Sequence, residues 1–297
     1  MASDISSRFA LGTAQIGMRY GIANATGKPG AEDAQRMLDS AWSAGIRCLD
    51  TAQNYGDAEA VIGEWHARHP DRRFRVITKM HPALDLSDAT VVRREIEASG
   101  ERLGVRPAGV LLHDPALLGR IGGSLGDALA AARASGATDA IGISVYTPEE
   151  FAAAIALPVV GIVQAPFNVF DRRIVEQGLV DKAVAAGKAV YLRSVFLQGL
   201  LTLAVEELPE RMAFAAESVA EWRELCARRG LAPYPTAFKF AQQSVAEACL
   251  VVGCETEEQL ARNVDVFNAP PLRQDDISAI ARLTRAPDRM INPALWP

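Results

Sequence analysis

Residues 45–56 read Gly-Ile-Arg-Cys-Leu-Asp-Thr-Ala-Gln-Asn-Tyr-Gly, a short apolar run that leads into an acid and then a tyrosine. The apolar run predicts a β-strand over residues 46–50, which Asp50 ends. Tyr55 follows on the loop that the polar residues and Gly56 indicate. A carboxylate at a strand end and a phenol on the next loop can face one point, so this stretch predicts a functional site rather than part of a core.

The same alternation of a short apolar run and a longer amphipathic segment continues along the chain. We expect strands at residues 9–15, 46–50, 74–79, 109–113, 140–144, 159–164, 189–194 and 249–253. We expect helices at residues 31–44, 57–67, 88–103, 124–135, 175–186, 214–229, 236–243, 256–263 and 275–283, and another that begins at Thr147 and Pro148.

Strands that are continuously apolar are typical of parallel sheets covered on both faces. Eight strand–helix units in 297 residues predict a single (β/α)₈ TIM barrel, with an extra C-terminal helix and a tail over residues 286–297. The competing doubly wound sheet usually carries G-x-G-x-x-G after its first strand, and this sequence lacks that motif. No linker divides the chain, so we expect one domain over residues 1–297.

The composition excludes several classes of protein. Thirty-one basic and 36 acidic residues give a net charge of −5, which argues against a nucleic-acid surface. The four cysteines show no C-x-x-C spacing, the N-terminus has no secretory apolar region, and no apolar run is long enough for a membrane helix. We therefore expect a cytoplasmic protein with reduced thiols, without a bound metal, a membrane anchor or a nucleic-acid partner.

Functional side chains of such a barrel lie where strands end and the following loops begin. Lys79 and His113 end the third and fourth predicted strands, as Asp50 ends the second. An ammonium near Tyr55 would lower the pKa of the phenol from its usual value near 10, and Asp50 would keep Lys79 charged and oriented. Tyr55 could then act as general acid or base while His113 positions the same substrate oxygen. This predicts carbonyl reduction or alcohol oxidation, with the hydride supplied by a cofactor.

A series of motifs, in order along the predicted strands, supports this interpretation. They are Leu-Gly-Thr-Ala-Gln (11–15), Leu-Asp-Thr-Ala-Gln-Asn-Tyr-Gly (49–56), Ile-Thr-Lys (77–79), Leu-Leu-His-Asp-Pro (111–115), Gly-Ile-Ser (142–144), Gln164 with Asn168, and Gln259 with Asn263. In these motifs the chain resembles the aldo/keto reductase superfamily over nearly its whole length.

The resemblance implies an NAD(P)-dependent oxidoreductase whose catalytic residues are Asp50, Tyr55, Lys79 and His113. It implies that NAD or NADP binds in an extended form across the barrel mouth, with its carboxamide held by Ser144 and Gln164. It also implies that the C-terminal tail lies near that mouth. The cofactor-binding residues it implies are Gly12, Thr13, Asp50, Ser144, Gln164, Arg193, Ser194, Phe196, Gln198, Gly199, Gly253, Glu255, Thr256, Gln259 and Asn263.

The sequence departs from the family pattern at three places. Val145 replaces an asparagine that contacts the carboxamide, and Arg193 replaces an aromatic residue that stacks on the nicotinamide. Glu255 and Gln259 occupy positions that are often basic, and acids repel the 2′-phosphate of NADP. An acid can instead bind a ribose hydroxyl, so the sequence favours NAD over NADP.

Loop residues predict the kind of substrate less directly. Arg19, Arg172 and Arg173 are expected at the mouth, with Phe167 and other aromatic and polar groups. This mixture favours a polyhydroxylated or anionic small molecule, either a carbonyl compound or a polyol. Trp296 either closes over the site or packs against the barrel wall. The oligomeric state is not predicted.

Two other functions are compatible with the same residues. Lys79 could form a Schiff base, as in barrel aldolases, or the barrel could bind a nucleotide as a regulatory or redox-sensing protein without catalysis. His66 and His69 have a spacing that suits a metal, but a solvated helix face is the expected role of this pair.

Overall fold

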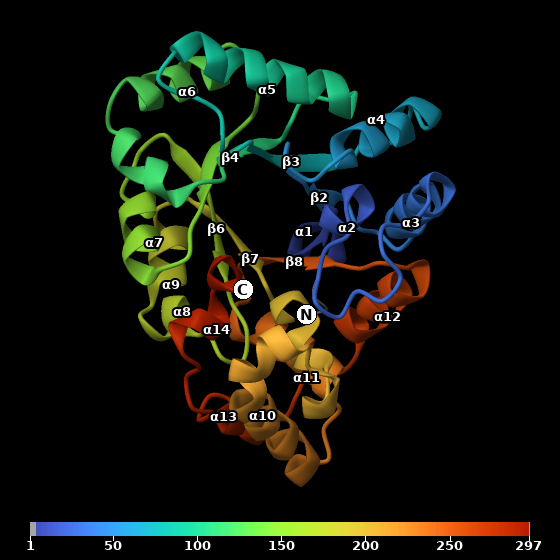
Figure 1. Cartoon of the computed structure of the whole chain (residues 1–297). Coiled ribbons are helices and arrows are strands. Elements are labelled where there is room, and N and C mark those ends of the chain that lie inside the picture. Colours follow the sequence, from blue (N-terminus) through green and yellow to red (C-terminus); the bar gives the residue numbers. More distant parts are fainter. Residues whose placement is uncertain (1–3, 297) are drawn as a thin grey trace.

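The computed structural model describes residues 4–296 and contains a closed barrel of eight parallel strands in sequence order (Figure 1). β1 pairs with both β2 and β8, which closes the sheet. The predicted TIM barrel is confirmed. The strands are β1 (Phe9–Gly12), β2 (Cys48–Asp50), β3 (Arg75–Met80), β4 (Gly109–Leu112), β5 (Ile141–Ser144), β6 (Val160–Pro166), β7 (Ala189–Arg193) and β8 (Cys249–Gly253).

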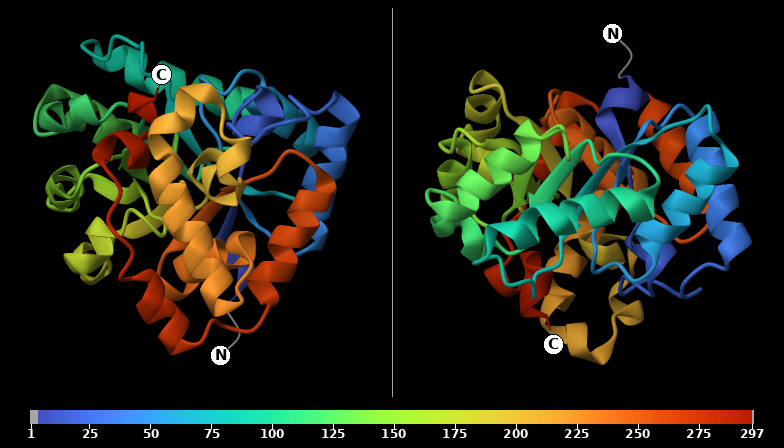
Figure 2. Two further views of the ribbon diagram at one scale, coloured as in Figure 1. Left: turned by 60° about the horizontal axis from the view of Figure 1, so that its bottom comes forward. Right: turned by 90° about the horizontal axis from the view of Figure 1, so that it is seen from above.

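Helices surround the strands on all sides, as the two views of Figure 2 show. The α-helices are α1 (Ile5–Arg8), α2 (Ala14–Gly17), α3 (Ala31–Ser43), α4 (Ala58–Arg68), α5 (Ala89–Leu103), α6 (Ser124–Ala134), α7 (Pro148–Ile155), α8 (Arg173–Glu176), α9 (Leu179–Ala185), α10 (Ala216–Arg229), α11 (Pro233–Ser244), α12 (Glu257–Asn268), α13 (Gln274–Ile280) and α14 (Asp288–Ile291). Short 3₁₀ helices are η1 (Pro115–Arg120), η2 (Leu197–Thr202), η3 (Val205–Glu207), η4 (Glu210–Ala215) and η5 (Pro293–Leu295).

Local signals set several of these boundaries. Thr147 and Glu150 form the expected capping box at the start of α7, and Gly230 ends α10 in the left-handed conformation. Several predicted boundaries differ by two or more residues, and two of the differences have a clear local cause. β1 ends at Gly12 rather than residue 15, because the chain turns at Thr13 and continues as α2. The helix expected over 175–186 is divided into α8 and α9 by Gly178, which has φ +63°.

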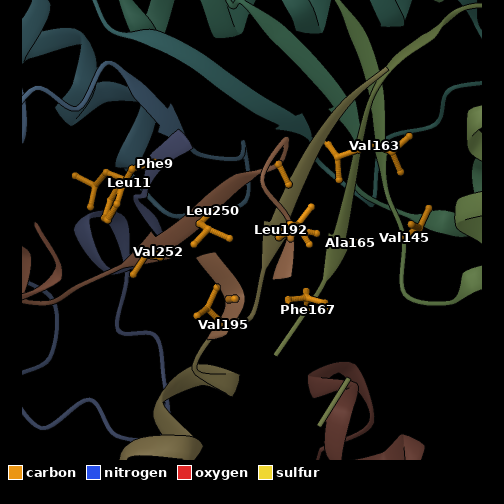
Figure 3. Close-up of a cluster of buried hydrophobic side chains, with 14 of the residues drawn as sticks. Phe9, Leu11, Val145, Val163, Ala165, Phe167, Leu192, Val195, Leu250 and Val252 are labelled. Carbon is orange, nitrogen blue, oxygen red and sulfur yellow. The ribbon is translucent and has the colours of Figure 1, made fainter. Parts of the chain in front are cut away.

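The strands carry two apolar layers, one on each face of the barrel wall. The outer layer packs against the helices and includes Phe9, Leu11, Leu192 and Leu250 (Figure 3). A separate cluster fills the lower interior of the barrel, and we call it the floor layer. Its members are Ala10, Cys48, Ile77, Leu111, Ile162, Tyr191 and Cys249.

Side chains of a strand alternate between its two faces, so the residue two positions after each floor residue also points inward. On five strands this next inward position carries a polar or charged side chain, and on β5 a serine follows the interior Gly142 in the same way. We call this set the mouth layer. Its members are Asp50, Lys79, His113, Ser144, Gln164 and Arg193.

The C-terminal segment returns to the mouth of the barrel. Pro293 and Ala294 of η5 line the central cavity, as expected for the tail. Trp296 donates from Nε1 to the Met290 carbonyl at 3.1 Å and packs against the core. Pro297, the last residue of the predicted tail, lies outside the described residues. Within residues 4–296 no helix combines the length and the apolar character needed to span a membrane.

Candidate active site

A cavity of about 740 Å³ opens at the carboxyl ends of the strands. Asp50, His113, Gln164 and Arg193 of the mouth layer line it, together with Tyr55. Its far side is formed by the loops after β7 and β8 and by α12. The cavity therefore connects the predicted catalytic residues with the predicted cofactor-binding loops.

The loop that carries Tyr55 is held by backbone contacts on two sides. Thr51 and Gln53 donate their amides to the carbonyls of Ile77 and Lys79, which extends the pairing of β2 with β3. Gly17 and Gly56 bring this loop against the β1 loop, and a Cβ at Gly17 would overlap the Tyr55 carbonyl. These contacts fix where the Tyr55 ring enters the cavity.

Lys79 lies at the centre of the polar group. Its Nζ donates to Asp50 Oδ2 at 2.7 Å, to the Thr51 carbonyl at 2.9 Å and to the Tyr55 hydroxyl at 3.5 Å. Gln164 Nε2 donates to the other Asp50 oxygen at 2.7 Å. The side chain of Lys79 is 1% exposed, and the residue does not line the cavity. The ammonium thus lies beneath Tyr55, outside the lining of the cavity.

The expectation that Lys79 lowers the pKa of Tyr55 is wrong for this state of the protein. Burial, followed by the charge of Asp50, raises the pKa of Tyr55 above its usual value. Asp50 pairs with the Lys79 ammonium at 2.7 Å, and its charge adds to the larger effect of burial. Tyr55 is therefore a neutral phenol at neutral pH, a group that can donate a proton.

His113 faces Tyr55 with its ring centre 6.0 Å from that of the phenol. Burial, with the charges of Lys79 and Arg193, lowers the pKa of His113 to about 3, so the imidazole is neutral. Its Nδ1 is buried without a hydrogen-bond partner, and so is Asn54 Oδ1. Both residues line the cavity, and unpaired buried polar atoms there are suited to a ligand.

Arg193 ends β7 beside this group. Its Nε donates to Ser144 Oγ at 3.3 Å, one terminal nitrogen to Ser194 Oγ at 3.2 Å and the other to the Val145 carbonyl at 3.1 Å. The guanidinium stacks over the ring of Tyr146, 4.3 Å from its centre. No ion pair within residues 4–296 involves Arg193.

The predicted cofactor residues lie along the cavity with two exceptions. Ser144 is buried behind Arg193, and its Oγ lies 3.5 Å from Gln164 Oε1 and 3.3 Å from Arg193 Nε. Thr256 caps α12 by accepting from the Gln259 amide and faces a neighbouring crevice. The other predicted residues all line the cavity: Gly12, Thr13, Asp50, Gln164, Arg193, Ser194, Phe196, Gln198, Gly199, Gly253, Glu255, Gln259 and Asn263.

The loop after β7 has an unusual backbone. Ser194, Leu197 and Gln198 have φ values of 61°, 47° and 55°, and no other non-glycine residue in the described part of the chain has a positive φ. Such conformations cost about 1–3 kcal/mol each and cluster at ligand sites. The Gln198 carbonyl accepts from the amide of Ile22, so this loop and the β1 loop meet at the edge of the cavity.

Several residues expected near the substrate are structural instead. Arg173 pairs with Asp171, and Arg172 pairs with Glu176 and donates to the Leu283 carbonyl. Phe167 is fully buried in the core. None of these three predicted mouth residues lines the cavity.

The expectation of a solvated face for His66 is also wrong. The residue is 2% exposed. Its Nδ1 lies 2.8 Å from the Leu103 carbonyl, and its Nε2 accepts from the Phe74 amide at 3.2 Å. Both ring nitrogens are therefore used within the fold and are not free to bind a metal.

Sequence reasoning missed one tyrosine of the mouth. Tyr146 lines the cavity and carries the Arg193 stack. It follows the predicted strand end at Ser144 by two residues, and that position is the signal that could have identified it. Tyr20 also lies in the cavity, and burial raises its pKa to about 12.

With this geometry in place, comparison with known proteins decides the family. A model of the aldo/keto reductase family matches residues 8–285. The chain belongs to the aldo/keto reductase family. Aldo/keto reductases are oxidoreductases that generally use NAD(P)(H). The chain is therefore an oxidoreductase.

Two relatives of this aldo/keto reductase have names that refer to sugars. A 6-dehydroglucose reductase of Novosphingobium aromaticivorans is 26% identical over 262 residues, covering 82% of this chain and 83% of that protein. A D-threo-aldose 1-dehydrogenase of a Pseudomonas species is 27% identical over 309 residues, covering 89% and 93%.

Solved aldo/keto reductase structures have the same fold. One from Bacillus halodurans, in its holo form, gives a TM-score of 0.76 at 19% identity, covering 96% of this chain and 95% of that one. A glycerol dehydrogenase of Gluconobacter oxydans gives 0.72 at 22% identity and 99% coverage of both chains.

Proposed function

We propose that this aldo/keto reductase interconverts a carbonyl compound and its alcohol, with a nicotinamide dinucleotide as hydride carrier and Tyr55 as general acid/base. One observation carries the proposal. The Lys79 ammonium bridges Asp50 and the Tyr55 hydroxyl, at 2.7 and 3.5 Å, beneath a phenol that lines the cavity. This places a proton donor and a positive charge at one point.

In the reducing direction the protein supplies the proton and holds the oxygen. The hydroxyl of Tyr55 donates its proton as negative charge develops on the substrate oxygen. The Lys79 ammonium then stabilises the phenolate, while Asp50 and Gln164 keep the ammonium in place. His113, a neutral imidazole, is suited to hold the same oxygen by a hydrogen bond. Alcohol oxidation uses these groups in reverse.

The lining of the cavity fits an extended dinucleotide, which supplies the hydride when bound. Gly12 and Gly253 face each other on β1 and β8, and a Cβ at Gly12 would lie 3.2 Å from the Gly253 nitrogen. Lack of side chains here lets the two strands approach closely at the edge of the cavity, which both glycines line. Gln164 would hold the carboxamide with Ser144 behind it, and residues 194–199 the pyrophosphate. Asn263 and Gln259 would hold the adenosine end.

Glu255 supports a preference for NAD. It lines the cavity, its Oε2 accepts from Thr26 Oγ1 at 3.4 Å, and burial raises its pKa. The 2′-phosphate of NADP would be repelled at this position. We expect a higher kcat/KM with NAD than with NADP, and Glu255→Arg should raise the value for NADP about tenfold. Glu258→Arg, at an exposed residue outside the cavity, is the control. It should leave the ratio of kcat/KM with NAD to kcat/KM with NADP unchanged.

A polyhydroxylated substrate, such as a sugar or its oxidised derivative, fits the polar lining best. Tyr20, Tyr146 and Asn54 surround the catalytic phenol. The names of two relatives also support a sugar-like substrate, since they refer to an aldose and to 6-dehydroglucose. Arg172 and Arg173 are bound within the fold and do not line the cavity.

A screen of aldehydes, sugars and alcohols with both dinucleotides tests the proposal, with absorbance of the reduced nicotinamide as the readout. We expect turnover with at least one sugar or polyol. Borohydride added with substrate should trap no adduct, because all three protons of the Lys79 ammonium have partners and the residue does not line the cavity. A covalent adduct on Lys79 would instead establish a Schiff-base aldolase.

A further inference from the structure

We propose that the fixed positive charge of Arg193 makes the protein bind the reduced nicotinamide more tightly than the oxidised one. The inference rests on the proposed function, since it concerns the dinucleotide assigned to this cavity. It goes further, because it assigns the side chain a task in setting the direction of the reaction.

The first step is the position of the guanidinium. Arg193 lines the cavity, and its Nε donates to Ser144 Oγ, which itself lies 3.5 Å from Gln164 Oε1. Ser144 and Gln164 are the pair assigned to the carboxamide of the nicotinamide. Arg193 is therefore joined directly to the part of the site that holds the reacting ring.

The second step is the rigidity of the side chain. Hydrogen bonds to Ser144, Ser194 and the Val145 carbonyl fix all three guanidinium nitrogens. Tyr146 covers the guanidinium at 4.3 Å. A planar cation held in this way is pre-organised, so it cannot turn away when a ring of like charge approaches.

The third step is the balance of charge. Lys79 and Asp50 form a buried pair at 2.7 Å and compensate each other. His113 is neutral, and no carboxylate of residues 4–296 pairs with Arg193. Among the charged groups joined to Ser144 and Gln164 in the described structure, Arg193 is thus the one without an ion-pair partner.

The consequence follows from the charge of the nicotinamide in its two states. In alcohol oxidation a hydride, which is a proton with two electrons, leaves the alcohol carbon for the ring. The hydroxyl proton goes to Tyr55 after the phenol has lost its own proton to solvent. The ring changes from a pyridinium with charge +1 to a neutral dihydropyridine. A fixed cation beside it disfavours only the first form. Arg193 therefore favours the reduced cofactor and, on the enzyme, oxidation of the alcohol.

Calorimetric titration of the folded protein with NAD⁺ and NADH, and with NADP⁺ and NADPH, tests this without turnover. The measured quantity is the ratio of the Kd of the oxidised form to that of the reduced form. In Arg193→Met the ratio should fall about tenfold, equal to about 30 mV for a two-electron couple. Arg193→Lys keeps the charge and should keep the ratio within about threefold.

Arg262→Met is the matched control. Arg262 also lines the cavity, but it lies on α12 against Tyr234, away from Ser144 and Gln164. The charge near Arg262 does not change when the nicotinamide is reduced. Binding of the oxidised and of the reduced dinucleotide should therefore weaken equally. Should Arg193→Met fail to fold, Arg193→Gln removes the same charge while keeping polar contacts.

Each outcome has a distinct meaning. An unchanged ratio of the two Kd values in the neutral Arg193 variants would overturn the role proposed for the Arg193 charge while leaving the proposed function intact. A similar fall in Arg193→Lys would assign the effect to shape rather than charge and would also overturn it. Failure of the wild-type protein to bind any of the four dinucleotides would instead overturn the proposed function.

Discussion

The floor layer and the mouth layer are built by the same strands, from residues only two positions apart. Along β4 the floor residue is Leu111 and the mouth residue is His113. Along β7 they are Tyr191 and Arg193. The floor is apolar, closed and filled by side-chain packing. The mouth holds a buried ion pair, an imidazole with an unpaired nitrogen and a cation without a counter-ion. One strand thus supplies stability and chemistry within two residues.

Two tyrosines show what separates the layers. Tyr191 of the floor and Tyr55 above it are both buried, and burial raises the pKa of each. The Tyr191 hydroxyl has only the Cys48 thiol beside it, at 3.8 Å. Tyr55 has the Lys79 ammonium at 3.5 Å and lines the cavity. A buried phenol is therefore suited to catalysis only where a cation and a ligand can both reach it.

The same substitution should change kcat strongly at one tyrosine and hardly at the other, and this is the largest difference we expect. Tyr55→Phe removes the proton donor and should lower kcat about 10²- to 10⁴-fold, with dinucleotide Kd values within about twofold of wild type. Tyr191→Phe removes a hydroxyl that contacts only a thiol and should leave kcat within about twofold. Steady-state kinetics and calorimetry measure both quantities.

Full activity in Tyr55→Phe would remove the basis of the mechanism. Tyr20→Phe is a second control, since this phenol also lines the cavity but has no ammonium within hydrogen-bond distance in the described structure. It should retain most of kcat, with any effect appearing in the KM of the substrate.

Breaking the buried pair of the mouth should reduce stability as well as activity. Lys79→Met leaves Asp50 buried with only Gln164 as a side-chain partner, so we expect a loss of about 3–5 kcal/mol in the free energy of unfolding. Urea titration followed by circular dichroism measures it. Asp50→Asn combined with Lys79→Met removes both charges and should recover part of this loss. No recovery would contradict the assigned pairing.

A floor substitution should reduce stability while leaving the chemistry intact. Leu111→Ala leaves a cavity that Gly142, its neighbour on β5, has no side chain to fill, so we expect a loss of about 3 kcal/mol. The kcat measured well below the melting temperature should stay within about twofold. A large fall in kcat of the folded variant would show that the floor and the mouth are not separable.

The smallest effect concerns acid stability. The pKa of His113 falls to about 3 on folding, so below its ordinary value near 6.5 the unfolded chain takes up a proton that the folded chain does not. Stability is therefore lost as the pH falls from 6.5 towards 3. His113→Asn should reduce the loss between pH 7 and pH 5 by about 1–2 kcal/mol. His81→Asn, at an exposed residue, is the control, and equal slopes in all three proteins would contradict the assignment.

The sequence allowed prediction of the barrel, its strand order and the residues that meet at the mouth, because alternation and strand ends are local features. The break at Gly178 was not predictable, since the apolar pattern continues on both sides of that glycine. Arg172 and Arg173 were misjudged because part of their binding comes from residues far along the chain, at 283 and 288. The raised pKa of Tyr55 was not predictable, because its main cause is burial of the phenol and its second cause is the charge of Asp50, and both depend on the three-dimensional structure.

The spacing between floor and mouth also bears on insertions and deletions. One added residue between Leu111 and His113 would turn the imidazole towards the helices, because the faces of a strand alternate with every residue. A point substitution at either position changes one layer only. Replacement can therefore alter the chemistry of this barrel gradually, whereas a change of length inside a strand would abolish the site in one step.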